Sequence, residues 1–253
     1  MSKLCTRAIA AALCGCLVLA GCAAGTSSNS GSSAPEAQTS TSKQEDAHVA
    51  SGEWKSNTEP PSANLSVEQE AVFKRATEGV TDVSYGPVAV IGQQVVAGTN
   101  SAFLCQNTYW EGDATPEWMV VTIYNDLKGN AQVVEEKGLD VADVRTSDTD
   151  AGHEATGAWA APVPQKEASL SGPAQKAFEA AAETRGDVSL TPIALLGTQG
   201  ESGTGVSYRF VAIEVPKREE RGTACIVDVS EDAGGAYTVT SSAPLDIAYY
   251  VTR

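Results

Sequence analysis

The chain has 253 residues, of which 42% are hydrophobic, and its 32 acidic and 17 basic side chains give a formal net charge of −15 at pH 7. A chain this acidic repels nucleic acid and anionic lipid, because contacts with phosphate need clustered Lys and Arg. The basic residues form no stripe along the sequence, so we expect no nucleic-acid partner.

The N-terminal 22 residues have the parts of a secretory signal. Lys3 and Arg7 supply a basic start, and the apolar run that follows over residues 8–20 is too short to span a membrane. The run ends in Leu19-Ala20-Gly21-Cys22. This ending resembles the lipobox of bacterial lipoproteins, in which cleavage falls before the cysteine.

The lipobox resemblance implies a signal peptide over residues 1–21 and lipidation of Cys22. Leu19, Ala20 and Gly21 would complete the motif. A diacylglyceryl group on Cys22 brings two acyl chains, palmitate among the usual ones, and two chains anchor a protein stably where one does not. The resemblance therefore implies a protein on the extracytoplasmic side of the cell membrane. The alternative is an ordinary cleaved signal with an incidental cysteine.

Two segments are too polar to build a core. Residues 22–64 consist mainly of Ser, Thr, Ala, Gly and acidic residues, which predicts a disordered tether behind the lipidated cysteine. Residues 142–168 are rich in Asp, Ala, Gly and Pro and are expected to be a linker, in which Trp159 is the one large hydrophobic residue.

The signal and the anchor together account for four of the six cysteines, and Cys105 and Cys225 remain in the folded part. Both lie in apolar, strand-like runs and neither has a metal-ligand spacing. The pattern favours two small buried hydrophobic side chains, with a disulfide between them as the alternative for an extracytoplasmic protein.

Residues 65–141 and 169–253 are copies of one another. A shift of 105 residues superposes the front halves without a gap, and a shift of 106 superposes the back halves. The matched pairs include Leu65 with Leu170, Phe73 with Phe178, Gly92 with Gly197, Gly98 with Gly203 and Asp126 with Asp232. Two copies indicate a tandem duplication of one module.

Each copy reads as one helix and then about four strands. In the first copy a helix begins after Ser66, an N-cap that forms a capping box with Gln69. The expected strands cover residues 87–92, 99–107, 118–125 and 131–136, and residues 126–130 and 232–235 read as hairpin turns. A helix on a four-stranded antiparallel sheet is an α+β architecture.

The stretch Gln94-Val95-Val96-Ala97-Gly98, followed by Thr99-Asn100, lies between the first two strands. Here the sequence resembles the cystatins, which inhibit papain-like cysteine peptidases. The resemblance implies two tandem cystatin-like modules. It also implies a binding loop at Gln94–Gly98 whose partner is a cysteine peptidase. In that family a wedge plugs the peptidase cleft; its parts are an N-terminal segment with a glycine, this loop, and a second hairpin with Pro-Trp.

The sequence departs from the cystatin pattern outside this loop. The second hairpin, over residues 125–130, has no Pro-Trp. Trp118, with Pro116, lies at the start of the strand over residues 118–125, which is the wrong end of that strand for the hairpin. Gly52 could stand in for the N-terminal glycine. In copy two Glu201 stands where Val96 stands, so we expect copy two not to act the same way. The alternative is that the loop belongs to the fold and inhibits nothing.

No enzyme motif appears in the chain. The only histidines, His48 and His153, fall in the predicted tether and linker, where no partner could be held within hydrogen-bond reach. We therefore expect no catalysis, no metal and no cofactor. The favoured function is a membrane-anchored protein-binding module, with a structural or spacer lipoprotein of the envelope as the alternative. Exposure of residues 95–97 on a hairpin tip would favour binding, and their burial would favour the spacer.

Overall fold

The computed structural model describes residues 52–55, 63–109, 116–147, 158–160, 164–165, 168–201, 205–219 and 221–251. Module 1 contains α1 (Val67–Ala76), β1 (Val83–Val96), β2 (Gly98–Tyr109), β3 (Glu117–Asp126) and β4 (Ala131–Gly138). Module 2 contains α2 (Gly172–Thr184), β5 (Val188–Glu201), β6 (Gly205–Pro216), β7 (Thr223–Glu231), β8 (Tyr237–Pro244) and α3 (Ile247–Val251).

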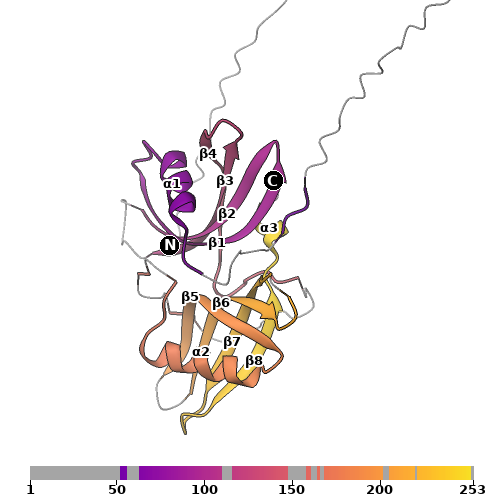
Figure 1. The fold of residues 1–253 in the computed structure, drawn as a ribbon. Helices are drawn as coiled ribbons and strands as arrows, with labels where there is room; N and C mark the ends of the chain where they lie inside the picture. The colour runs from indigo at the N-terminus through magenta and orange to yellow at the C-terminus, as the bar shows by residue number, and fades with distance from the viewer. Residues whose placement is uncertain are drawn as a thin grey trace, which may run out of the picture. The chain divides into compact units, whose positions relative to one another are not determined.

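Each module is an α+β unit of one long helix and a four-stranded antiparallel sheet, as the sequence predicts (Figure 1). The strand orders are β1-β2-β3-β4 and β5-β6-β7-β8, so every neighbour in the sheet is also the neighbour in sequence. The four predicted strands of the first copy all lie within β1 to β4. β1 is longer than expected and continues as far as Val96.

Local sequence signals set the ends of several elements. The capping box at α1 is confirmed, because the Gln69 backbone N–H donates to Ser66 Oγ and the Ser66 N–H donates to Gln69 Oε1. The Asp126 carboxylate closes the β3–β4 turn by accepting from two backbone N–H groups, and Asp232 closes the β7–β8 turn in the same way. Both predicted hairpin turns are therefore present.

One face of each sheet packs against its own helix. Phe73 of α1 meets the ring of Phe103 edge to face at 5.0 Å between centroids, and Phe178 of α2 meets Phe210 at 5.4 Å. The two thiols lie in these separate clusters, Cys105 under α1 and Cys225 under α2, and both are free. The expectation of two buried hydrophobic cysteines is confirmed, and they form no disulfide.

The other faces of the two sheets contribute to one shared core. It contains Val88, Ile91, Leu104 and Val120 from module 1 together with Ile193, Leu196, Val211, Ile213 and Ile226 from module 2. Trp118 joins the two halves directly, since its indole Nε1 donates to the Leu196 carbonyl at 3.0 Å. Each sheet therefore depends on the other to exclude water from this face.

Chain segments outside the two copies also join the folded unit. Lys55, which falls in the predicted tether, forms an antiparallel bridge with Gln93 on β1. Ala160, in the predicted linker, forms the same bridge with Thr198 on β5, again 105 residues further on. The duplication therefore begins before residue 65, and it includes Trp54 with its counterpart Trp159.

The ungapped alignment of the two copies is wrong at the first hairpin. Val96 pairs directly with Gly98 across a one-residue tip, whereas Glu201 pairs with Gly205, which lies four positions further along the chain. The counterpart of Gly98 is therefore Gly205 and not Gly203. Both glycines have a positive φ, +133° and +124°, which a residue with a side chain rarely adopts.

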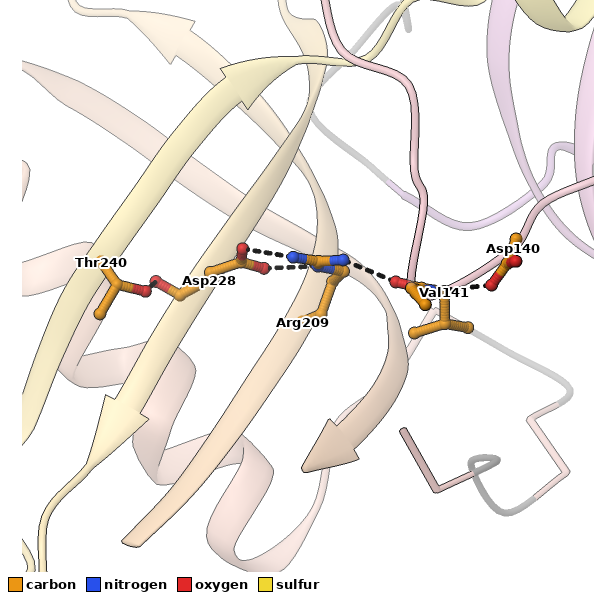
Figure 2. Close-up of polar contacts among 6 residues, drawn as sticks. Asp140, Val141, Arg209, Asp228 and Thr240 are labelled. Carbon is orange, nitrogen blue, oxygen red and sulfur yellow. Dashed lines mark hydrogen bonds and ion pairs between the residues drawn. The ribbon is translucent and has the colours of Figure 1, made fainter. Parts of the chain in front are cut away.

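A buried ion pair lies in module 2. Arg209 donates to both carboxylate oxygens of Asp228 at 2.8 Å, and its third hydrogen bond, at 2.6 Å, reaches the Val141 carbonyl beyond the last strand of module 1 (Figure 2). The guanidinium carbon lies 4.6 Å from the centroid of a Trp159 ring. One charged side chain thus contacts the residue just before the predicted linker, Val141, and a residue within it, Trp159.

Candidate functional site

The β1–β2 hairpin presents an apolar tip. Only Ala97 lies outside the two strands, so the tip is tighter than a loop over the whole of Gln94–Gly98. The Val95 side chain is 72% exposed and Ala97 is exposed, whereas Val96 is half-buried. The resemblance to cystatins implies that Val95, Val96 and Ala97 all belong to the binding loop. In the structure only Val95 and Ala97 are exposed to solvent.

The residues around the tip fix its shape. Gln94 Oε1 accepts a hydrogen bond from Asn100 Nδ2 at 2.8 Å, which braces the hairpin two residue pairs below the closing pair Val96–Gly98. The Tyr124 hydroxyl of β3 donates to the Ala97 carbonyl at 2.6 Å. A Cβ on Gly98 would lie 2.4 Å from the Asn125 carbonyl oxygen, so only glycine allows β2 to approach β3 this closely. Gln94 and Gly98 therefore support the tip.

Gly52 lies directly beside the tip. Its backbone N–H donates to the Val95 carbonyl at 2.9 Å, and a Cβ on it would lie 2.6 Å from that oxygen. The two backbone bonds between Lys55 and Gln93, at 2.8 and 2.9 Å, hold the following residues along the edge of β1. The segment that contains Gly52 thus reaches the tip without a side chain at its closest point.

The β3–β4 turn is the third part of this edge. Gly98 pairs with Asp126, so the turn begins next to the β1–β2 tip. Leu127 follows in the turn with 86% of its side chain exposed. The hydrogen bond from the Asn130 side chain lowers the pKa of Asp126, which keeps the closing carboxylate charged.

Sequence reasoning missed two of these residues. Leu127 is an isolated apolar residue in a turn of polar residues, a signal that was present in the sequence. Tyr124 could not be found, because its role depends on the register of β2 against β3. Trp118, the only candidate for a Pro-Trp equivalent, is buried in the shared core and bonded to Leu196. We call Gly52, Val95, Ala97 and Leu127 the module 1 edge.

The structure does not describe the other residues to which the sequence analysis gave a possible function. Leu19, Ala20, Gly21 and Cys22 lie outside the described residues, as do His48 and His153. Within the described ranges, no three His, Cys, Asp or Glu side chains lie close enough together to hold a metal ion. In the same ranges no helix has the length and apolar character needed to cross a membrane.

The thiols of the folded part are not poised for chemistry. Burial raises the pKa of the Cys225 thiol to about 12. Burial, with a smaller contribution from the Glu136 carboxylate, raises the pKa of Cys105 well above its ordinary value. Both thiols stay protonated at neutral pH, and the thiolate is the nucleophilic form.

Comparison of the chain with models of known protein families and with curated proteins finds no match.

Proposed function

We propose that the chain is a lipoprotein, anchored to the cell membrane through diacylglyceryl Cys22 and facing the extracytoplasmic side. In this proposal module 1 is a cystatin-like, non-catalytic binding module, and its partner is a papain-family cysteine peptidase. The module 1 edge is the contact surface, and Val95 and Leu127 are its apolar anchors. Module 2 supports module 1 through the shared core.

The convergence of three chain segments at one edge carries this proposal. Gly52 bonds to Val95, and Gly98 pairs with Asp126, so segments about 75 residues apart along the chain meet around a single tip. Two large apolar side chains at this edge are more than 70% exposed, at Val95 and Leu127. Exposed apolar side chains that gather in one place are typical of contact surfaces with proteins.

The edge is preorganised for binding. The Tyr124–Ala97 hydrogen bond, the Gln94–Asn100 bond and the close contact at Gly98 hold the tip in one conformation. A rigid tip loses little conformational entropy when it enters a cleft, which leaves more of the contact energy as affinity. Because Leu127 takes the place of an aromatic anchor, we expect weaker binding than a Pro-Trp hairpin would give.

Inhibition of papain by a soluble fragment tests the proposal. Residues 47–253 form one compact unit with its own cores, so this fragment is suitable without the anchor. We expect an inhibition constant below about 1 μM, raised more than about tenfold by Val95→Asp, because a buried charge replaces an apolar contact. Val80→Asp is the matched control, since Val80 is an exposed valine beyond the other end of β1.

Two results would overturn the proposed function. One is the absence of inhibition at tens of micromolar fragment, which would leave the resemblance as one of fold alone. The other is equal inhibition by the wild type and by Val95→Asp, which would place the contact elsewhere. The first result, together with normal folding of the fragment, would favour the spacer role.

A further inference from the structure

The two modules contact each other through equivalent residues. Gly92 of β1 lies against Ile247 of α3, since a Cβ on this glycine would lie 3.0 Å from Ile247 Cγ2. Gly197 of β5 lies against Val141 in the same way, because a Cβ on it would lie 3.0 Å from Val141 Cγ1. In the duplication Gly197 is the counterpart of Gly92, and Ile247 is the counterpart of Val141. Each module therefore supplies both members of the same contact, which is the defining property of an isologous interface.

The shared core is built from equivalent positions of the two sheets. Its members include five counterpart pairs, given with the module 1 residue first: Val88 and Ile193, Ala89 and Ala194, Ile91 and Leu196, Leu104 and Val211, and Val120 and Ile226. Leu139 and Leu245, the residues directly after β4 and β8, are a further buried pair in this core. The two sheets thus bury the same face against each other, as the subunits of a symmetric dimer do.

Each module also sends an arm of the chain onto the other. After module 1, the Arg145 backbone N–H donates to the Tyr250 hydroxyl oxygen at 3.0 Å. Before α2 of module 2, the Gln165 backbone N–H donates to Gln106 Oε1 at 2.6 Å. Both bonds cross from one module to the other, one at each end of the linker. A cut between residues 147 and 158 would leave both arms attached to their own modules.

Two polar contacts distinguish the modules from each other. Trp118 of module 1 donates to the Leu196 carbonyl at 3.0 Å, and Arg209 of module 2 donates to the Val141 carbonyl at 2.6 Å (Figure 2). In the opposite copy each donor position holds alanine, which cannot form the bond. A pair of identical modules would therefore lack one of these two bonds. The contacts favour the pairing of a module 1 with a module 2.

We propose that the shared-core faces form a dimer-type interface that holds the two modules together without the linker. The partner that fits the module 1 face is a module 2, from the same chain or from a second copy of the protein. In the intact chain the linker keeps the chain's own module 2 at a high effective concentration, which favours a closed monomer. Once the linker is cut, halves from different chains pair as well. The inference does not rest on the proposed function, because it needs no outside partner.

A cleavable linker tests whether the interface is sufficient. A site for a sequence-specific protease is inserted between residues 147 and 158 of the 47–253 fragment, and the folded protein is cut there. The first half then contains module 1 and the second half contains module 2. We expect the halves to elute together in size-exclusion chromatography at about 10 μM, with a dissociation constant below about 1 μM, because aliphatic side chains of both sheets are buried between them. Separation of the halves at this concentration would overturn the inference.

Exchange of halves between chains tests the choice of partner. One cut sample with an affinity tag on its first half and a second, isotopically labelled cut sample are unfolded together in urea and refolded by dilution. We expect the tagged first half to recover labelled second halves in clear excess over labelled first halves. The uncut fragment, treated in the same way, is the control for refolding. If that control refolds, the absence of mixed pairs, or equal recovery of labelled first and second halves, would refute the assignment.

Substitutions at the two counterpart glycines test the reciprocity of the interface. Gly92→Val and Gly197→Val are each expected to weaken the pairing of the cut halves at least about fivefold, because the added atoms press on the opposite module. Gly138→Val is the matched control, since a Cβ at this position would meet nothing within 4 Å, and it should change the pairing less than about twofold. An effect at only one of the two glycines, or an equal effect at Gly138, would contradict an isologous interface.

Discussion

The buried ion pair of module 2 offers a quantitative test of how the two modules are held together. Arg209 is 1% exposed, and its guanidinium donates two hydrogen bonds to the Asp228 carboxylate and one to the Val141 carbonyl. In copy one the same register positions hold an uncharged pair, Ala102 opposite Thr122. The fold therefore accommodates both solutions, and the chain supplies its own replacement residues.

The expected energies follow from the buried charge that each variant leaves without a counter-charge. Asp228→Thr leaves a buried guanidinium without a counter-charge, which typically costs about 3–5 kcal/mol of unfolding free energy. Arg209→Ala leaves the Asp228 carboxylate buried without a counter-charge and costs about the same. It also removes the hydrogen bond to the Val141 carbonyl. The double variant, Arg209→Ala with Asp228→Thr, leaves no buried charge unpaired. Its cost should fall below the sum of the single costs by about 2–3 kcal/mol.

Urea unfolding of the 47–253 fragment at pH 7 measures all three variants in one double-mutant cycle. Asp143→Thr is the control, because its ion pair with Arg145 is largely exposed and its loss should cost no more than about 0.5 kcal/mol. Additive single costs, or an Asp228→Thr cost below about 1 kcal/mol, would refute the view that this pair is a dry, mutually dependent unit.

Three further predictions concern the anchor, the tip and the thiols. Cys22→Ser is expected to move the protein from the membrane fraction to the soluble fraction, and retention in the membrane fraction would contradict lipidation at this residue. Gly98→Ala should cost at least about 1–3 kcal/mol, because φ is +133° and the new Cβ would lie 2.4 Å from the Asn125 carbonyl. Gly129→Ala, at φ +85° with open space around it, should cost less by the same unfolding assay. Cys225 keeps its proton in the folded state up to about pH 12, whereas the unfolded thiol ionises near 9.0. Unfolding free energy should therefore fall as pH rises from 9 towards 12, and Cys225→Ala should reduce that fall.

The sequence predicts the local structure well because local signals decide it. Ser66 and Gln69 lie three residues apart, and Asp126 bonds to groups two and four residues away, so their roles can be inferred from spacing. What spacing cannot give is the register between strands, and this is why Tyr124 and the true partner of Gly98 were missed.

The sequence also contains a signal for the shared core, an apolar run in β3 that indicates a sheet covered on both faces. The six residues of β3 from Trp118 to Ile123 are apolar in the sequence apart from Thr122, and all six are buried in the structure, as is typical of a strand covered on both faces. Such a run cannot belong to a sheet with one face in water, so a second layer was implied. Trp159 stands out in the sequence as the one large hydrophobic residue of the predicted linker, but its correspondence with Trp54 does not, because the residues around both have the composition of a tether or linker.

The most direct test of the account is an NMR titration of the labelled 47–253 fragment with papain whose catalytic cysteine is replaced by serine. The account predicts the largest changes at the backbone amides of Gly52, Gly98 and Leu127, in the three segments that meet at the module 1 edge. Resonances of β5 to β8 should change little. Changes centred on module 2, or no change at concentrations of tens of micromolar, would contradict the central claim.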